Sequence, residues 1–237
     1  MPGYTRHQLK HDRLTDATQG TVSWAVDHQN KLIVVGLIIL LAAAIVSGGW
    51  YYLDHRNEQA SVALGQAVRT FETPIRPAGI PANPEQKSYA SITERGKDAE
   101  KQFLEVADKY PHTHSADIAG YLAGVAAVDA GDNQVAERQL KAAADLRQED
   151  LSSLAKMALA AFYRSTKRDS DALAIYNQLA EHPTAAVSKA AALLAKAEML
   201  EKTQPAEANK VYQQLKTEDP TGPIGKLADD RLANPKK

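Results

Sequence analysis

The hydrophobic and polar positions divide the chain into one uninterrupted apolar stretch and a longer region with periodic apolar residues. Residues 32–53 read LIVVGLIILLAAAIVSGGWYYL, and no charged side chain occurs between Lys31 and Asp54. As a helix this stretch is about 33 Å long, which matches a hydrocarbon core of about 30 Å. A buried helix of a soluble protein seldom runs this long without a polar stripe. The pattern therefore predicts a transmembrane helix.

The ends of this stretch fit a membrane anchor. We place the anchor from Leu32 to Leu53, with Trp50 and Tyr51 in an aromatic belt at the far interface. A cleaved signal peptide is the alternative, because the residues at 47–49 are small. However, a signal peptide has an apolar core of about 7 to 15 residues after a short basic start. The apolar run here is longer and follows 31 residues, so we interpret it as a retained anchor.

Residues 1–31 are predicted to be a short cytoplasmic tail, because cytoplasmic flanks carry the excess of Lys and Arg. The basic residues before the span are Arg6, Lys10, Arg13 and Lys31, and those in the twenty residues after it are Arg56 and Arg69. Residues 54–237 then form a domain on the opposite side of the membrane. His7 and His11 have a spacing that suits a metal, but no third ligand lies nearby, so no metal site is predicted.

Apolar residues at helical spacing from Glu58 to Phe71 predict a helix that continues out of the membrane. Residues 73–96 follow, and the four prolines and Gly79 within 74–84 argue against regular structure there. A loop of this length in a compact domain is either functional or mobile. We therefore predict a Pro-rich insertion loop, with partner binding as one of its uses.

The region after the insertion is periodic. Alanines recur at intervals of 37, 36 and 36 residues, and each is followed four residues later by a large apolar residue. These pairs, which are predicted to pack the repeats, are Ala99 and Phe103, Ala136 and Leu140, Ala172 and Tyr176, and Ala208 and Tyr212. A period of about 20 to 50 residues is the signature of a solenoid. The chain is therefore predicted to be all-α, with an α-solenoid of about four helical hairpins after the membrane helix.

Each repeat is predicted to be a pair of helices. Alanine-rich stretches at 115–130, 150–166 and 185–201 lie between the markers. A small residue lets two helices approach closely, and a large residue one turn later on the same face fills the space beside it. Residues 221–237 predict a short amphipathic capping helix, because the last hairpin of a solenoid has no following neighbour.

The spacing resembles that of the tetratricopeptide repeat, whose second helix has an alanine, a large apolar residue four positions on and a proline twelve positions after the alanine. Pro111 and Pro220 match this spacing, and Pro183 misses it by one residue. The second unit departs further, because it has no proline at position 148. The similarity implies a fold that binds other proteins.

The similarity extends to the first helix of each repeat. Gly124 lies 12 residues before Ala136, as the family pattern requires. Gly65 has a similar setting but lies 34 residues before Ala99. We therefore predict that the helix beside the membrane is the first half of repeat one and that the Pro-rich insertion separates it from the second half.

A protein-binding groove is expected on the inner surface of the solenoid, which is lined by first helices. Such surfaces typically bind extended or helical peptide segments. The tetratricopeptide spacing predicts that the groove contains Tyr121, Val125, Met157 and Arg164. A membrane tether would raise the effective concentration of this groove near membrane partners.

Composition and motifs argue against catalysis and nucleic-acid binding. The 28 Lys and Arg are balanced by 29 Asp and Glu, whereas nucleic-acid binding needs clustered cations. The absence of cysteine excludes disulfides and thiolate metal sites. No phosphate loop, GxSxG or HExxH motif is present. His112 and His114 are predicted to be exposed turn residues and Asp150 to start a helix. We therefore predict no catalytic residue, metal or cofactor.

From Trp24 onward the layout resembles the ancillary subunit family of the bacterial SecYEG translocon, which has one span, a cytoplasmic amino terminus and a periplasmic tetratricopeptide-like domain. The similarity depends on Trp24, the span, the split first unit and the sequences GYLA at 120–123 and GDNQVA at 131–136. It implies an inner-membrane protein that associates with the translocon and a membrane-anchored peptidyl-prolyl isomerase chaperone, and that receives secreted clients in a chaperone-like role. An envelope or cell-division scaffold and a transmembrane sensor are the alternative functions.

Overall fold

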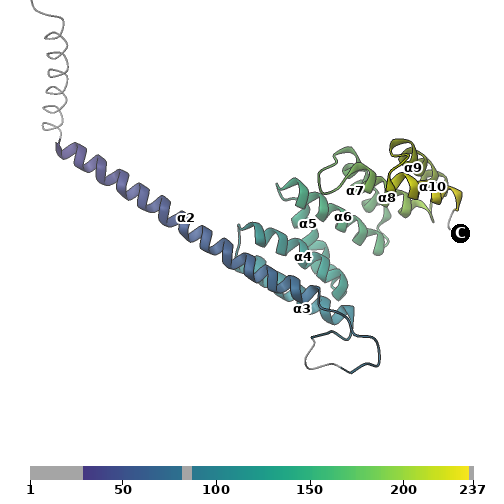
Figure 1. Ribbon diagram of the computed structural model, residues 1–237, viewed down its shortest axis with the longest axis horizontal. Coiled ribbons are helices and arrows are strands. Elements are labelled where there is room, and N and C mark those ends of the chain that lie inside the picture. The colour runs from purple at the N-terminus through teal and green to yellow at the C-terminus, as the bar shows by residue number, and fades with distance from the viewer. Residues whose placement is uncertain (1–28, 82–86, 235–237) are drawn as a thin grey trace, which may run out of the picture. The chain divides into compact units, whose positions relative to one another are not determined.

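The computed structural model describes residues 29–81 and 87–234, and this part of the chain is helical (Figure 1). Its nine helices are α2 (Gln29–Phe71), α3 (Ile92–Lys109), α4 (His114–Ala130), α5 (Asn133–Ala144), α6 (Glu149–Ser165), α7 (Asp169–Glu181), α8 (Lys189–Leu200), α9 (Pro205–Glu218) and α10 (Pro223–Ala233). The described residues contain no strand, and one isolated β-bridge joins Ile75 to Tyr89. The predicted all-α class is confirmed.

The chain divides after His55 into two compact units, each described by itself. In α2, the most apolar window of 18 residues has a mean hydropathy of 2.7 and contains no buried residue. The helix is therefore long and apolar enough to cross a membrane. The Ser47 hydroxyl donates to the carbonyl of Ala43 at 2.8 Å, so this polar group is satisfied within the helix, as a hydrocarbon environment requires.

The predicted anchor residues belong to α2. Leu32 lies in its first turn. Trp50, Tyr51 and Leu53 follow in the same helix, and the side chains of these three residues are exposed. Because α2 begins at Gln29, the last residues of the predicted tail are helical. The rest of that tail, residues 1–28, lies outside the described residues, together with Trp24 and the His7 and His11 pair.

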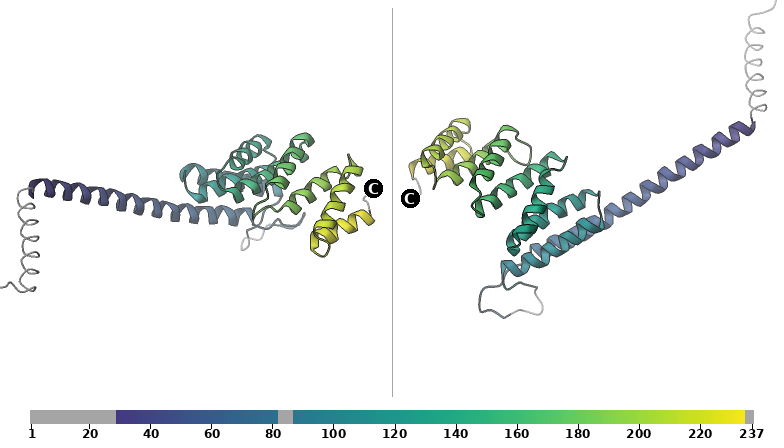
Figure 2. Two further views of the ribbon diagram at one scale, coloured as in Figure 1. Left: turned by 90° about the horizontal axis from the view of Figure 1, so that it is seen from above. Right: turned by 180° about the vertical axis from the view of Figure 1, so that it is seen from behind.

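The second unit is a series of helical hairpins in which each helix from α3 to α10 packs on the next along the chain (Figures 1 and 2). The helices α3, α5, α7 and α9 carry the alanines and large apolar residues of the repeat. All eight side chains are at most 2% exposed: Ala99, Phe103, Ala136, Leu140, Ala172, Tyr176, Ala208 and Tyr212. Buried small and large residues thus alternate along the array. The helices α4, α6 and α8 are the first helices of the hairpins whose second helices are α5, α7 and α9.

A close approach between α4 and α5 depends on Gly124. A Cβ atom at this position would lie 2.8 Å from Leu140 Cγ and 3.1 Å from the Leu140 backbone nitrogen. These distances are shorter than van der Waals contact, so the fully buried Leu140 occupies the space that a side chain would need. The large residue of the second helix is therefore paired with a glycine of the first.

The carboxyl-terminal part of α2 packs on α3 and completes the first hairpin. Ala60 and Ala67 of α2 belong to the same buried cluster as Ala99 and Phe103 of α3. The rings of Phe71 and Phe103 meet edge to face, with their centroids 6.0 Å apart. This segment of α2 therefore contributes a first-helix face to the repeat domain.

The predicted insertion loop, residues 73–96, is shorter in the structure. The helix α3 already begins at Ile92, because the Ser91 side chain accepts a hydrogen bond from the backbone of its first turn. Within the described part of the loop, the Tyr89 hydroxyl donates to the Asp98 carboxylate at 2.9 Å. Burial and this hydrogen bond raise the pKa of Tyr89 to about 12. The end of the loop is thus fastened to α3.

The helix α10 covers the carboxyl end of the array, beside α9 (Figure 2). Ala228 is fully buried, and Ile224 and Leu232 pack against the cluster that contains Tyr212. Without this helix the last hairpin would expose apolar surface, since a solenoid repeat buries its face only against a neighbour. This helix lies within residues 221–237, the range predicted to be a cap, and its apolar residues pack against the end of the array.

Candidate protein-binding groove

A groove lies between the first helices α4 and α6. Its larger part is a pocket of 1010 Å³ that is lined by both helices and by the connection between α7 and α8. The large apolar residues that the two helices contribute to its lining are Ile118, Tyr121, Leu122, Leu151 and Leu154. The volume is at the upper end of the range of about 300 to 1,000 Å³ that is typical of ligand sites. The larger pocket can therefore accommodate several apolar side chains of a partner.

A second pocket of 220 Å³ lies between the same two helices. Val125 and Val128 of α4 line it, together with Ala158 and Ala161 of α6. Tyr121, Val125 and Val128 follow one another at helical spacing, so they lie on one face of α4. The larger and smaller pockets therefore lie along the same face of α4, and we refer to them together as the groove.

The sequence of α4 explains why this face is open. Alanines occupy the opposite side of the helix and are fully buried: Ala119, Ala123, Ala126 and Ala127. These small residues allow the neighbouring helices to pack closely against α4. The larger residues of α4 consequently remain on the groove side, where Ile118, Tyr121 and Leu122 are only half-buried.

The four predicted groove residues take different positions. Tyr121 lines the larger pocket and Val125 lines the smaller one. Met157 is half-buried and packs against the buried cluster that contains Leu179. Arg164 is exposed on α6. Neither Met157 nor Arg164 lines these two pockets.

Other lining residues were not identified from the sequence. Ile118 lies three residues before Tyr121, and Leu154 lies three residues before Met157, so helical spacing alone could have indicated both. The connection between α7 and α8 contributes residues 183–185 to the larger pocket. No local pattern in the sequence shows that this connection reaches the groove.

The larger pocket has an acidic rim at the beginning of α6. Glu149 and Asp150 lie in the first turn of α6 and line the pocket. Asp150 was predicted to start the helix, but α6 begins one residue earlier, after Gln148 at the cap position. The Asp150 carboxylate instead accepts a hydrogen bond from the backbone of Ala186 at 3.1 Å. It thereby holds the α7–α8 connection against α6.

Tyr121 and two histidines are the polar residues to consider at or near the larger pocket. Burial raises the pKa of Tyr121, whose hydroxyl has no hydrogen-bond partner among the described residues. His112 and His114 are exposed, and His114 lines the larger pocket at the start of α4. The described ranges contain no group of three or more metal-ligating side chains.

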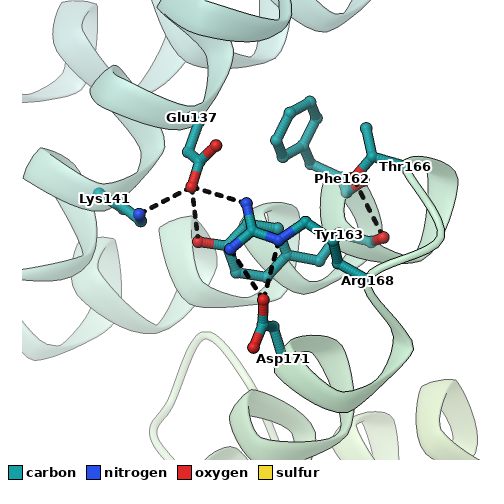
Figure 3. Close-up of polar contacts among 7 residues, drawn as sticks. All are labelled: Glu137, Lys141, Phe162, Tyr163, Thr166, Arg168 and Asp171. Carbon is teal, nitrogen blue, oxygen red and sulfur yellow. Dashed lines mark hydrogen bonds and ion pairs between the residues drawn. The ribbon is translucent and has the colours of Figure 1, made fainter.

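A polar network joins α5, α6 and α7 (Figure 3). One carboxylate oxygen of Glu137 accepts from Lys141 at 2.7 Å, from Arg168 at 2.8 Å and from the Tyr163 hydroxyl at 3.2 Å. Arg168 also donates to Asp171 at 2.8 Å, and its guanidinium lies 4.0 Å from the centre of the Tyr163 ring. The network fixes the α6–α7 turn on α5 and thus holds the helix pair that carries one wall of the groove.

The network makes stability depend on pH. Its hydrogen bonds lower the pKa of Glu137 from 4.5 to about 2. Because the pKa is lower in the folded state, the stabilisation is complete above about pH 4.5 and is lost as the pH falls toward about 2. The melting temperature of the wild type should fall when the pH is lowered from about 6 to about 3. In the Glu137→Gln variant this fall should be smaller by about 2 to 4 °C, as thermal unfolding at the two pH values measures.

The matched control is Glu105→Gln, which changes an exposed carboxylate of α3. This variant should keep the wild-type slope of melting temperature against pH. If Glu137→Gln has the wild-type slope too, the network does not stabilise the folded protein.

Comparison with known proteins gives one family match. The model of the tetratricopeptide repeat-like domain matches residues 24–186. Searches of curated proteins and of solved structures give no match. The matched range contains the apolar part of α2 and the helices α3 to α7, and therefore both walls of the groove.

Proposed function

The chain belongs to the tetratricopeptide repeat-like domain family, and from this premise we propose that it is a membrane-anchored protein-binding module that assists secretion at the bacterial SecYEG translocon. The observation that carries the proposal is that one helix, α2, is apolar enough to cross a membrane and also supplies a packed face of the repeat domain. A binding domain linked to such a helix would be tethered to the membrane.

The family match supports a retained anchor. The matched range begins at residue 24, ahead of the apolar part of α2, so the apolar helix belongs to the sequence that the family shares. A cleaved signal peptide would not be kept with the mature domain. The basic residues before the span favour a cytoplasmic amino terminus, and the repeat domain then lies in the periplasm, anchored in the inner membrane.

The role at the translocon is supported by the resemblance to its single-span ancillary subunits. Secreted clients emerge at the membrane, where a tethered groove has a high effective concentration. The SecYEG subunits and a membrane-anchored peptidyl-prolyl isomerase chaperone are the expected stable partners. Binding requires no covalent chemistry, so the module works by holding segments of other proteins.

Crosslinking in intact membranes tests this function. A photoreactive residue in place of Leu154, which is exposed in the larger pocket, should capture translocon subunits, the chaperone or secreted chains. The same residue in place of Ile92, which is exposed outside the groove, should capture none of them. Capture of cell-wall enzymes alone would favour an envelope scaffold, and capture of a cytoplasmic regulator alone would favour a sensor. Either result would overturn the proposal.

A further inference from the structure

The larger pocket offers apolar surface to a partner. Leu122 of α4 and Leu151 and Leu154 of α6 line it, and Leu154 is 37% exposed. Transfer of an apolar side chain from water onto such a surface is favourable. The Tyr121 hydroxyl, which has no partner among the described residues, can hydrogen-bond a peptide backbone without regard to sequence. The partner must therefore bring apolar side chains.

The charge of the same pocket is negative. Glu149 and Asp150 line one end, and no Lys or Arg is among the described residues that line it. Arg147 precedes this end in sequence but does not line the pocket. The amino terminus of α6 contributes a partial positive charge of about +0.5, which is less than the charge of two carboxylates. A cation on the partner is therefore favoured at this end.

Apolar surface and negative charge occur together within the first two turns of α6. We propose that the larger pocket selects segments of other proteins in which two or more large apolar residues are flanked by Lys or Arg. This inference rests on the proposed protein-binding function and specifies the chemistry of the partner. An apolar segment with acidic flanks would bring like charges to Glu149 and Asp150, which opposes binding.

Binding of three labelled peptides to the full-length protein in lipid nanodiscs tests the proposal. The first peptide has large apolar residues and two lysines at one end. The second has glutamates in place of the lysines, and the third has serines in place of the apolar residues. Fluorescence anisotropy should show that the first binds at least about tenfold more tightly than either of the others.

A charge-reversed variant identifies the acidic rim as the source of selectivity. Glu149→Lys should weaken binding of the lysine peptide about three- to tenfold and reduce its salt dependence. Asp169→Lys is the matched control, because Asp169 has the same place in the first turn of α7 and does not line the pocket. The control should bind all three peptides as the wild type does.

A second variant tests the apolar surface. Leu154→Ser should weaken binding of the lysine peptide about fivefold to tenfold, because one exposed apolar contact is lost. Ile92→Ser removes another exposed apolar side chain, which lies outside the pocket, and should leave binding unchanged. The side chains substituted in these variants and controls are all exposed: Glu149, Asp169, Leu154 and Ile92. Circular dichroism should therefore show wild-type helix content for each variant.

Two results would overturn the proposed selectivity. One is equal affinity for the lysine and glutamate peptides, and the other is an unchanged affinity in Glu149→Lys. If residue 154 still crosslinked to the translocon in either case, the protein-binding function would stand and this inference alone would fail. If the protein bound none of the peptides and residue 154 captured no protein, both would be wrong.

Discussion

Replacement of Phe103 with alanine is expected to lower the free energy of unfolding by about 3 to 5 kcal/mol. Phe103 is fully buried in α3, where it packs against Ala60 and Ala67 of α2 and meets the ring of Phe71. Truncation removes this apolar contact and leaves a cavity that the rigid helix pair fills only in part. Urea unfolding of the full-length protein in detergent, followed by circular dichroism, measures the loss.

The same variant tests whether α2 belongs to the first repeat. Because Phe103 joins α3 to α2, limited proteolysis should cleave Phe103→Ala within residues 56–71 faster than the wild type. Phe103→Leu keeps most of the volume and should lose less than about 1.5 kcal/mol. Leu154→Ala changes an exposed side chain and should lose less than about 1 kcal/mol. A loss below about 1 kcal/mol for Phe103→Ala would contradict packing of α2 on α3.

The repeat architecture could be predicted because its cause is local. Each alanine must meet a neighbouring helix, and each large residue four positions later must fill the space beside it, so the requirement recurs with the period of the hairpin. Ala136 and Leu140 show this most clearly, since Leu140 occupies the space left by Gly124. In a solenoid each hairpin contacts only its neighbours, and no distant part of the sequence is needed to read the pattern.

The ends of helices were less predictable, because they depend on which side chain reaches which backbone group. Ser91 caps α3 within the range predicted to be loop. Asp150 follows the cap position of α6 and bonds Ala186 instead. The ion pair between Glu137 and Arg168 joins residues 31 positions apart and follows from the packed hairpins, not from any local pattern.

Helical spacing indicates some of the residues that line the two pockets and misses others. Tyr121 and Val125 lie on the face of α4 that helical spacing indicates. On α6, Met157 lines neither pocket, because it packs against the buried cluster to which Val187 of the α7–α8 connection belongs. Equivalent positions on two first helices, such as Tyr121 and Met157, therefore do not have the same surroundings, since the connections between hairpins differ in length and course.

Replacement of both Leu41 and Ile45 with arginine is expected to abolish membrane anchoring. Both residues lie near the middle of the predicted span, with 64% and 66% of their side chains exposed. A central Leu or Ile contributes about −0.3 to −0.6 kcal/mol to insertion, whereas a central Arg costs about 2.5 to 3.5 kcal/mol. The two substitutions together therefore disfavour insertion by about 6 to 8 kcal/mol.

Alkaline extraction of membranes measures this effect, and the wild type should stay in the pellet while the Leu41→Arg, Ile45→Arg variant moves to the supernatant. The matched control is Val62→Arg with Gln66→Arg, which has the same spacing on an exposed face of α2 beyond the span and should stay in the pellet. A variant at 41 and 45 that resists extraction would show that this part of α2 is not the anchor. Because residues 41 and 45 do not line the groove, the extracted variant should bind the lysine peptide as the wild type does. It should nevertheless lose its crosslinks to the translocon. The two measurements together separate the contribution of the tether from that of the binding surface.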